Sequence, residues 1–219
     1  MAQDPAGERA AERQTMLEWH LRARGIRDPR VLDAMGRVPR ELFVPAAVLA
    51  DAYADSPLPL GHGQTISQPY IVALTAEAAL LRPGDRVLDV GTGSGYAAAV
   101  YAAAGARVWS IEYIPALAEQ ARRALDAAGC GEVEVTTGDG TLGLPELAPF
   151  DAILAAAAGS EIPRPWVDQL AEGGRIVMPL ERGWGWQQLI RATRTGDELA
   201  IDDLGGVRFV PLRGAHGLR

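Results

Sequence analysis

Apolar residues in the first third of the chain recur at helical spacing. The segment 11–25, AERQTMLEWHLRARG, has this spacing and ends at a glycine, so a helix is predicted there. A second helix should begin after Asp28, a favourable N-cap, with Pro29 at its first position. The segment 67–81, SQPYIVALTAEAALL, predicts a third helix. We therefore expect this part of the chain to be helical, before any strand appears.

From Arg82 onward, short apolar runs alternate with helical segments. The runs are DRVLDVG, ARVWSIE, EVEVTTGDG, FDAILAAAA and GRIVMPL, and PRPWVDQLAEG before the last run is read as a helix. Apolar strands that alternate with helices predict a parallel sheet with helices on both faces. After this sheet, residues 187–212 read as three short strands joined by turns at TGDE and LGG. The expected fold class is α/β: a doubly wound, mostly parallel, Rossmann-like sheet with an N-terminal helical layer and an antiparallel C-terminal edge.

The chain of 219 residues suits one structural domain, since 48% of its residues are hydrophobic and 22% are charged. We divide it into four stretches. Residues 1–14 form a tail, residues 15–81 a helical covering segment, residues 82–212 the sheet domain, and residues 213–219 a second tail.

Charge and cysteine content narrow the classes of function. The net charge of −7 disfavours broad binding to nucleic acid or anionic membranes. One cysteine, Cys130, provides neither a disulfide framework nor a cysteine-based zinc site. No apolar run approaches the roughly 20 residues that span a bilayer, and the N-terminus does not resemble a signal peptide. We expect a cytoplasmic monomer without a metal site.

The glycine-rich segment VLDVGTGSGY follows a predicted strand and opens a predicted helix. Gly91, Gly93 and Gly95 permit a tight turn and a close approach of the backbone to a ligand. A dinucleotide fingerprint would place its third glycine at position 96, where this chain has Tyr96. The observed spacing is commoner in enzymes that use S-adenosylmethionine, whose carboxylate can bind the same amides.

Two carboxylates follow at the ends of later strands. Glu112 lies about twenty residues past the loop, where it can accept hydrogen bonds from ribose hydroxyls, although NAD-binding proteins share this feature. Asp139 and Gly140 in TTGDG follow the third strand, where Asp139 would accept from the exocyclic amine of adenine; a plain turn is the alternative. Together with the loop, these residues favour a methyltransferase over a dehydrogenase.

Several segments resemble the protein-L-isoaspartate (D-aspartate) O-methyltransferase family. They are VPRELFVP, AYADSPLPLGHGQTISQPYIVA, VLDVGTGSGY, TGDGTLGLPELAPFDAIL, IPRPWVDQLAEGGRIVMPL and VRFVPL, and the likeness runs from Thr15 to Leu212. The resemblance implies a cytosolic enzyme that uses S-adenosyl-L-methionine and releases S-adenosyl-L-homocysteine. Its substrates would be isoaspartyl residues in damaged proteins and peptides, methylated on the free α-carboxylate and repaired through a succinimide.

The resemblance also implies roles for particular residues. Ser67 matches the family's active-site serine. The expected cofactor-binding residues are Thr65, Ile66, Gly91, Thr92, Gly93, Ser94, Gly95, Glu112, Tyr113, Asp139 and Gly140. The segment from Val207 through Phe209 to Pro211 would frame the substrate, and His62 and Gln68 are assigned to the same mouth because they lie in the segment 61–70.

The polar residues of GHGQTISQPY suit a carboxylate acceptor. A carboxylate with a pKa of about 4 is ionised at neutral pH, so no general base is required. Neutral donors such as the Ser67 hydroxyl can hold it. The alternative role for Ser67 is a helix N-cap, and one residue can serve both roles. Trp184 and Trp186 in RGWGWQQL either stack on a peptide or cover a sheet edge. A natural-product aspartate methyltransferase and a non-catalytic cofactor-binding protein remain as alternative functions.

Overall fold

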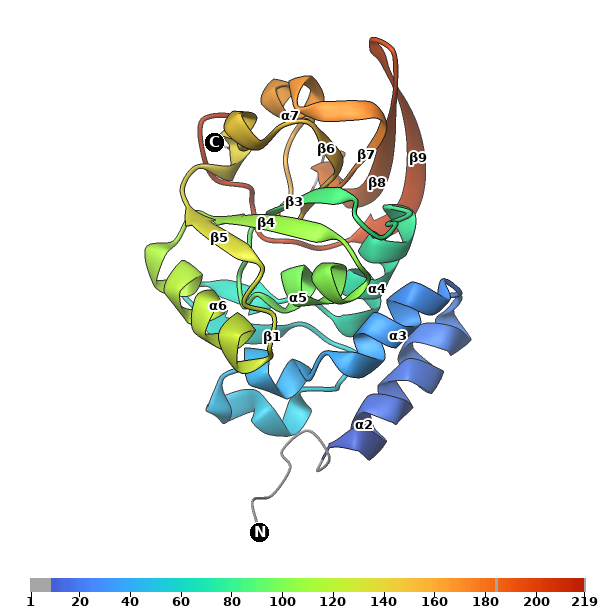
Figure 1. Cartoon of the computed structure of the whole chain (residues 1–219), viewed down its shortest axis with the longest axis vertical. Coiled ribbons are helices and arrows are strands. Elements are labelled where there is room, and N and C mark those ends of the chain that lie inside the picture. Colours follow the sequence, from blue (N-terminus) through green and yellow to red (C-terminus); the bar gives the residue numbers. More distant parts are fainter. Residues whose placement is uncertain (1–8, 184, 219) are drawn as a thin grey trace.

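The computed structural model describes residues 9–183 and 185–218. Their centre is a sheet in the strand order β5-β4-β3-β6-β7-β8-β9 (Figure 1). The strands are β3 (Arg86–Val90), β4 (Arg107–Glu112), β5 (Glu134–Thr137), β6 (Phe150–Ala155), β7 (Leu170–Glu181), β8 (Gln187–Thr195) and β9 (Glu198–Val207). The first five are parallel, whereas β8 and β9 pair antiparallel. The expected α/β class and antiparallel edge are confirmed.

Helices cover the two faces of the sheet unequally. The helices are α2 (Ala10–Thr15), which continues as a π-helix to Leu21, then α3 (Pro29–Arg37), α4 (Pro69–Ala78), α5 (Tyr96–Ala103), α6 (Pro115–Ala127) and α7 (Arg164–Asp168). Because successive strand residues point to opposite faces, Val87 packs in the core with α3 to α6, and its neighbour Leu88 packs with Trp166 of α7. In the described residues, no helix has both the length and the apolar character needed to cross a membrane.

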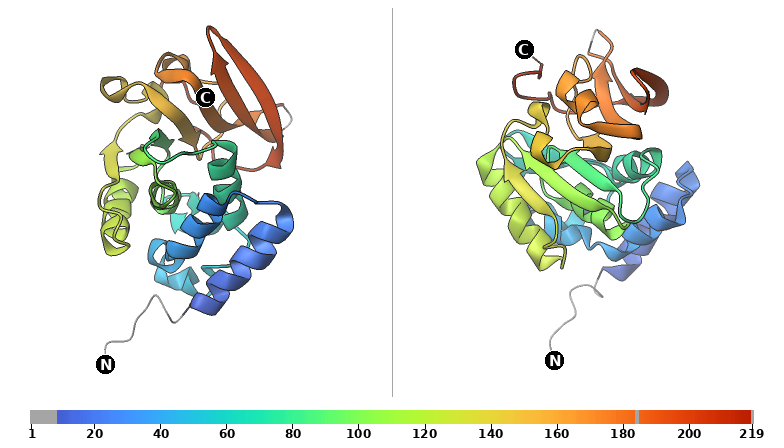
Figure 2. Two further views of the ribbon diagram at one scale, coloured as in Figure 1. Left: turned by 45° about the vertical axis from the view of Figure 1, so that its right-hand side comes forward. Right: turned by 45° about the horizontal axis from the view of Figure 1, so that its top comes forward.

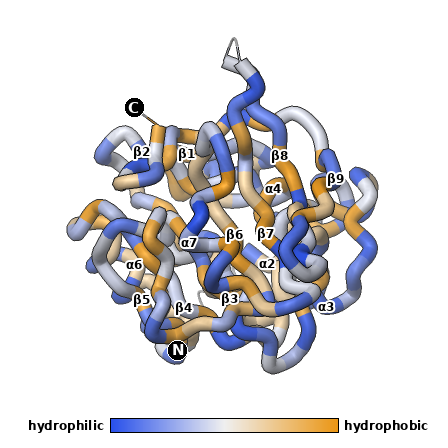
Figure 3. Tube along the Cα trace, turned by 90° about the horizontal axis from the view of Figure 1, so that it is seen from above, coloured by the Kyte–Doolittle hydropathy of each residue, from blue (hydrophilic) through white to orange (hydrophobic). Residues whose placement is uncertain are grey.

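The order of the strands creates a crevice beside β3. From β3 the chain moves through α5 and α6 to β4 and β5, and it then returns to β6 on the other side of β3. Open α/β sheets bind ligands at the carboxyl ends of strands beside such a reversal. Figure 3 shows β6 and β7 as largely hydrophobic traces in the middle of the molecule. The glycine-rich loop after β3 therefore lies at the expected ligand position.

The N-terminal layer differs from the expectation of helices alone. The chain forms a hairpin of β1 (Leu58–Gly61) and β2 (Gln64–Ile66). His62 and Gly63 between them have φ angles of 52° and 69°, as in the turns that join twisted antiparallel strands. Helix α2 starts at Ala10, one residue before the helix predicted over 11–25, so this helix overlaps the stretch 1–14 that was assigned to the tail.

Two further predictions near the C-terminus are wrong. Helix α7 ends at Asp168 and β7 begins at Leu170, because Leu170 pairs with the first residue of β6. The LGG segment is not a turn: β9 runs through it to Val207, with an irregularity in register that Gly205 accommodates at a φ of 107°. The TGDE turn is confirmed, and Figure 2 shows the tip of the β8–β9 hairpin at the end of the molecule opposite the N-terminal helices.

Candidate active site

The glycine-rich loop connects β3 to α5 in a conformation that glycine favours. Gly91, Gly93 and Gly95 have φ angles of 89°, 55° and 90°, in the left-handed region that other residues adopt at a cost. The Gly91 amide donates to the Ile111 carbonyl at 2.9 Å, so the loop crosses the end of β4. This course leaves the loop backbone facing the crevice.

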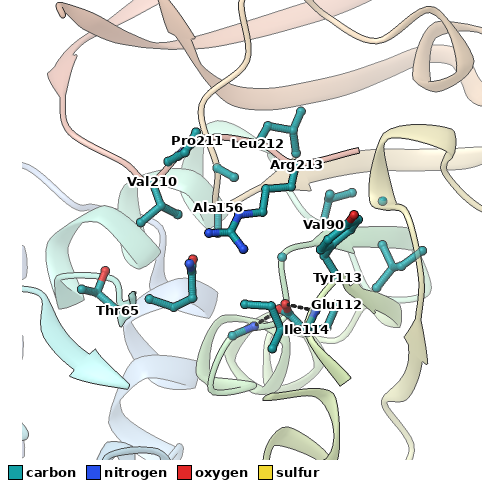
Figure 4. Close-up of a pocket in the computed structure, with 16 residues that line it drawn as sticks. Thr65, Val90, Glu112, Tyr113, Ile114, Ala156, Val210, Pro211, Leu212 and Arg213 are labelled. Atoms are coloured by element: carbon teal, nitrogen blue, oxygen red, sulfur yellow. Dashed lines mark hydrogen bonds between the residues drawn. The ribbon is translucent and has the colours of Figure 1, made fainter. Parts of the chain in front are cut away.

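Glu112 is buried at the end of β4 and holds the same loop. Its carboxylate accepts hydrogen bonds from the backbone amides of Gly93 at 2.8 Å and Ile114 at 2.9 Å (dashed lines in Figure 4). A carboxylate has about four acceptor positions, so it can still accept bonds from a ligand. The expected ribose acceptor is thus positioned by two fixed donors and lines the pocket.

A second acidic residue, Asp89, lies beneath the loop and was not predicted as part of the site. The Ser110 hydroxyl donates to the Asp89 carboxylate at 2.6 Å, and its oxygen is 2.5 Å from the hydroxyl of Thr92 in the loop. Burial raises the pKa of Asp89 to about 7, the Ser110 bond opposes this rise, and the nearby Glu112 adds to it. In the sequence, this buried acid was indicated by the position of Asp89 as the single charged residue in the apolar run VLDV.

Asp139 and Gly140 lie beyond the end of β5 and have different surroundings. Gly140 lines the pocket, and a Cβ there would be 2.6 Å from Cγ1 of Val90, so only glycine fits. The Asp139 carboxylate instead accepts from the amide and hydroxyl of Thr141, at 2.9 and 2.6 Å, and from the Ala215 amide at 2.7 Å. Burial raises the pKa of Asp139, but the hydrogen bonds to its carboxylate lower it by more, so the pKa lies below its usual value. Its contact with adenine stays a prediction.

The segment after β2 is fixed by a residue that sequence reasoning did not single out. Arg40 is fully buried and donates to the carbonyl of Ser67 at 2.8 Å and to that of Ala52 at 2.7 Å. Its guanidinium also lies 4.7 Å from the centre of the Tyr96 ring. Helix α4 begins at Pro69 with Gln68 as its N-cap and without a side-chain capping bond, so Ser67 does not cap this helix.

The C-terminal segment after β9 closes the other side of the crevice. The Ala158 amide donates to the Val210 carbonyl and the Leu212 amide donates to the Ala158 carbonyl, both at 2.8 Å, which docks the segment beside the end of β6. In Figure 4 the side chain of Arg213 points from this segment into the pocket, beside Ala156. The sequence did not indicate that Ala156 or Arg213 would line the site.

These elements enclose a pocket and an adjoining groove. The pocket lies over the glycine-rich loop and contains Glu112, Tyr113 and Gly140. The groove, with a volume of about 650 Å³, contains Ser67 and Gln68 on one side and Leu204 with residues 206–210 on the other. Thr65, Ala156 and Val210 line both, so the two spaces adjoin. Ile66, Thr92 and Ser94 line a smaller recess beneath the loop.

The groove is lined by positively charged residues, although the protein as a whole is acidic. Among the described residues that line it, the charged ones are Arg24 and Arg208. The Arg24 guanidinium lies 2.6 Å from the Asp55 carboxylate and 3.6 Å from the centre of the Tyr70 ring. The groove thus presents hydroxyl, amide, aromatic and cationic groups, which suit an anionic ligand.

The residues assigned to the substrate fall in three places. Gln68, Val207 and Phe209 line the groove. Pro211 lines the pocket over the glycine-rich loop instead. His62 is exposed in the β1–β2 turn and is not among the residues that line either space, so its contact with the substrate stays a prediction. Trp186 lines the groove, and Trp184 lies outside the described residues.

Comparisons with known proteins agree on one family. A profile of the family "Protein-L-isoaspartate(D-aspartate) O-methyltransferase (PCMT)" matches residues 11–217. A protein-L-isoaspartate O-methyltransferase of Methylorubrum populi is 60% identical over 92% of this chain and 95% of its own length. One of Methanoregula boonei is 51% identical over 95% of this chain and 96% of its own length.

Solved structures with the same name share the fold. One protein-L-isoaspartate O-methyltransferase has a TM-score of 0.85 and 32% identity, covering 94% of this chain and 67% of that protein. A Plasmodium falciparum structure with this name, in complex with S-adenosyl-L-homocysteine, has a TM-score of 0.82 and 29% identity over 92% of this chain and 98% of its own.

Proposed function

The chain belongs to the protein-L-isoaspartate(D-aspartate) O-methyltransferase family, and from this premise we propose how its residues carry out the family's reaction. That reaction is S-adenosylmethionine-dependent methylation of the α-carboxylate of L-isoaspartyl residues in damaged proteins and peptides. The observation that carries the proposal is the junction of the pocket and the groove at Thr65 and Ala156. A methyl donor and a carboxylate acceptor bound in the two spaces would meet there.

The residues of the pocket fit S-adenosylmethionine. The loop amides can bind its carboxylate, Glu112 can accept from the ribose hydroxyls, and Gly140 leaves room where a side chain would collide with Val90. When bound, this cofactor supplies a methyl group on a sulfonium and leaves as S-adenosylhomocysteine. The chain's own part is to hold the loop, through Glu112 and the Asp89–Ser110–Thr92 contacts.

The residues of the groove suit an acceptor that arrives already charged. Ser67 and the amide of Gln68 offer neutral donors, and the described lining residues include no carboxylate that would repel the substrate. Orienting two reactants can contribute roughly 7–11 kcal/mol to a reaction, so a site with little acid–base chemistry can still be an effective catalyst. We assign Ser67 to contact the acceptor, with Arg40 fixing its backbone.

The product accounts for the repair. The acceptor oxygen forms a bond to the methyl carbon while the sulfur–carbon bond breaks, so the carboxylate becomes a methyl ester. The backbone nitrogen of the following residue attacks this ester, methanol leaves, and a succinimide forms. Water opens that ring to aspartate or to isoaspartate, which can enter the groove again.

A pair of peptides tests the proposal. An isoaspartyl peptide and its aspartyl twin are incubated with the enzyme and S-adenosylmethionine labelled in the methyl group, and the labelled methanol released is measured. We expect release from the isoaspartyl peptide and almost none from its twin. Equal release from both, or none from either, would contradict the assignment.

The remaining expectations about partners belong to the same proposal. We propose that the enzyme is a cytoplasmic monomer that acts on flexible protein segments and does not bind nucleic acid. The net charge of −7 supports the last point, since nucleic-acid binding needs clustered cations. Light scattering during chromatography tests the oligomeric state directly.

A further inference from the structure

Trp186 is a large aromatic residue exposed at the edge of the substrate groove. It lies in the loop between β7 and β8, and 71% of its surface is exposed to solvent. It lines the groove together with Leu204 and Val207 of β9 and with Phe209, which follows that strand. An exposed apolar residue alone needs no explanation, but this one is placed among apolar groups beside the acceptor site.

The edge of the Trp186 ring lies near Gly206 of β9. A Cβ built on Gly206 would be 3.8 Å from the Cζ3 atom of Trp186, so the ring edge approaches β9 at a position that carries no side chain. The backbone of Trp186 is held by two hydrogen bonds: its amide donates to the Gly183 carbonyl at 3.0 Å, and its carbonyl accepts from the Arg182 amide at 2.8 Å. These two bonds fix the backbone from which the indole extends at the groove.

The ring has no aromatic or cationic partner within the part of the chain that the structure describes. The ring pairs found there involve Phe43 with Tyr96 and Trp109 with Phe150, and the arginines that lie over rings cover tyrosines and Trp109. The interactions that an indole makes best are therefore available to a ligand.

We propose that Trp186 is a specificity-determining residue that favours isoaspartyl substrates with an aromatic side chain close to the isoaspartyl residue. The inference rests on the proposed function, since it takes the groove as the peptide site. Aromatic pairs contribute about 0.5–1.5 kcal/mol beyond area burial, which corresponds to roughly twofold to twelvefold in kcat/KM. We assign Trp186 to the side-chain contacts of the peptide and not to the acceptor carboxylate, so its effect should appear mainly in KM and less in kcat.

The test uses isoaspartyl peptides in which phenylalanine replaces serine at one of three positions on either side of the isoaspartyl residue. In the unmodified enzyme, phenylalanine at one or more positions should raise kcat/KM by roughly twofold to twelvefold through a lower KM. Trp186→Ala should reduce the ratio of kcat/KM for the phenylalanine peptides to kcat/KM for the all-serine peptide to about one, whereas Trp186→Phe should retain most of the preference. Trp19→Ala is the matched control, because Trp19 is also 71% exposed and does not line the groove.

Two results would overturn the inference. One is an unmodified enzyme without any preference for the phenylalanine peptides, and the other is a preference that survives in Trp186→Ala or disappears equally in Trp19→Ala. The failure of the proposed function looks different, since the isoaspartyl peptides would then either not be methylated by any variant or be methylated no faster than their aspartyl twins.

Discussion

Replacement of the buried Arg40 should lower kcat/KM about a hundredfold in a protein that still folds. Its two hydrogen bonds reach the carbonyls of Ala52 and Ser67, and bonds to charged groups contribute about 1.5–3 kcal/mol each. Arg40→Met loses both bonds, but it also removes the several kcal/mol that burial of a charge costs. The same burial lowers the pKa of Arg40. Because these terms largely offset each other, we expect the free energy of unfolding to fall by only about 1–3 kcal/mol.

The loss of the Arg40 hydrogen bonds affects catalysis without the offset that removal of a buried charge gives to stability. Without its donor, the backbone at Ser67 is free to shift, and a displacement of about 1 Å near a reacting centre can reduce the rate roughly a hundredfold. The assays are urea unfolding, calorimetric binding of S-adenosylhomocysteine, and kcat/KM with an isoaspartyl peptide. Arg37→Met is the control, since the Arg37 side chain is 58% exposed and pairs with Asp33 on the surface of α3.

The comparison can refute the reasoning in two ways. If kcat/KM of the folded Arg40→Met protein equals that of Arg37→Met, Arg40 does not position Ser67. If affinity for S-adenosylhomocysteine falls as much as kcat/KM, Arg40 acts through the Tyr96 wall of the cofactor recess, because its guanidinium also lies over that ring.

Three further predictions address the cofactor and the acceptor. Ser67→Ala should lower kcat by roughly tenfold or more, because it removes a hydrogen bond to the charged acceptor. The dissociation constant of S-adenosylhomocysteine should stay within about threefold. Equal losses of kcat and of cofactor affinity would make Ser67 a wall of the pocket instead. Glu112→Gln should weaken S-adenosylhomocysteine binding about tenfold to a hundredfold in calorimetry, through the ribose bonds and the loop it holds, and unchanged binding would contradict its role. The pKa of Asp89 is raised by burial, so the folded protein binds more protons than the unfolded chain between about pH 4 and pH 7, and stability should fall as the pH rises through this window. Asp89→Asn should flatten that slope by up to about 1.4 kcal/mol per pH unit in urea unfolding, whereas parallel curves for the two proteins would disprove the assignment.

The features predicted correctly depend on local patterns. Apolar strands that alternate with helices define the parallel sheet, and the spacing of Gly91, Gly93 and Gly95 identifies the loop because each needs a positive φ. Asp28 and Pro29 were recognised as the start of α3 for a similar reason, since the Asp28 side chain accepts from an amide two residues later.

The β1–β2 hairpin was missed because its strands are short. They have four and three residues, too few for a clear alternation, and Pro59 and Gly61 are unusual in strands. A signal was nevertheless present. Leu58 and Leu60 are buried and alternate with these exposed residues, and a glycine follows His62 at the turn.

The contacts that complete the site could not be predicted from spacing. Arg40 reaches carbonyls 12 and 27 residues along the chain, and the Ala215 amide binds Asp139 across 76 residues. Such pairs form only when the tertiary fold brings distant segments together. For that reason the carboxylate expected at the adenine edge also anchors the C-terminal segment.

In the groove, the residues that attract the substrate differ from the residue that contacts its acceptor carboxylate. Exposed charges more than about 10 Å apart are largely screened at 0.1 M salt, so the net charge of −7 has little influence inside the groove compared with Arg24 and Arg208. Both arginines are exposed, and Arg24 forms an ion pair with Asp55, so they attract an anionic peptide without binding it tightly.

The half-buried Ser67 offers only a neutral hydroxyl to the acceptor. A carboxylate held by neutral donors keeps more of its nucleophilicity than one paired with a guanidinium, because charge-assisted bonds stabilise the ground state more strongly. The lack of an acid or base in GHGQTISQPY is therefore consistent with an acceptor whose own ionisation supplies the nucleophile.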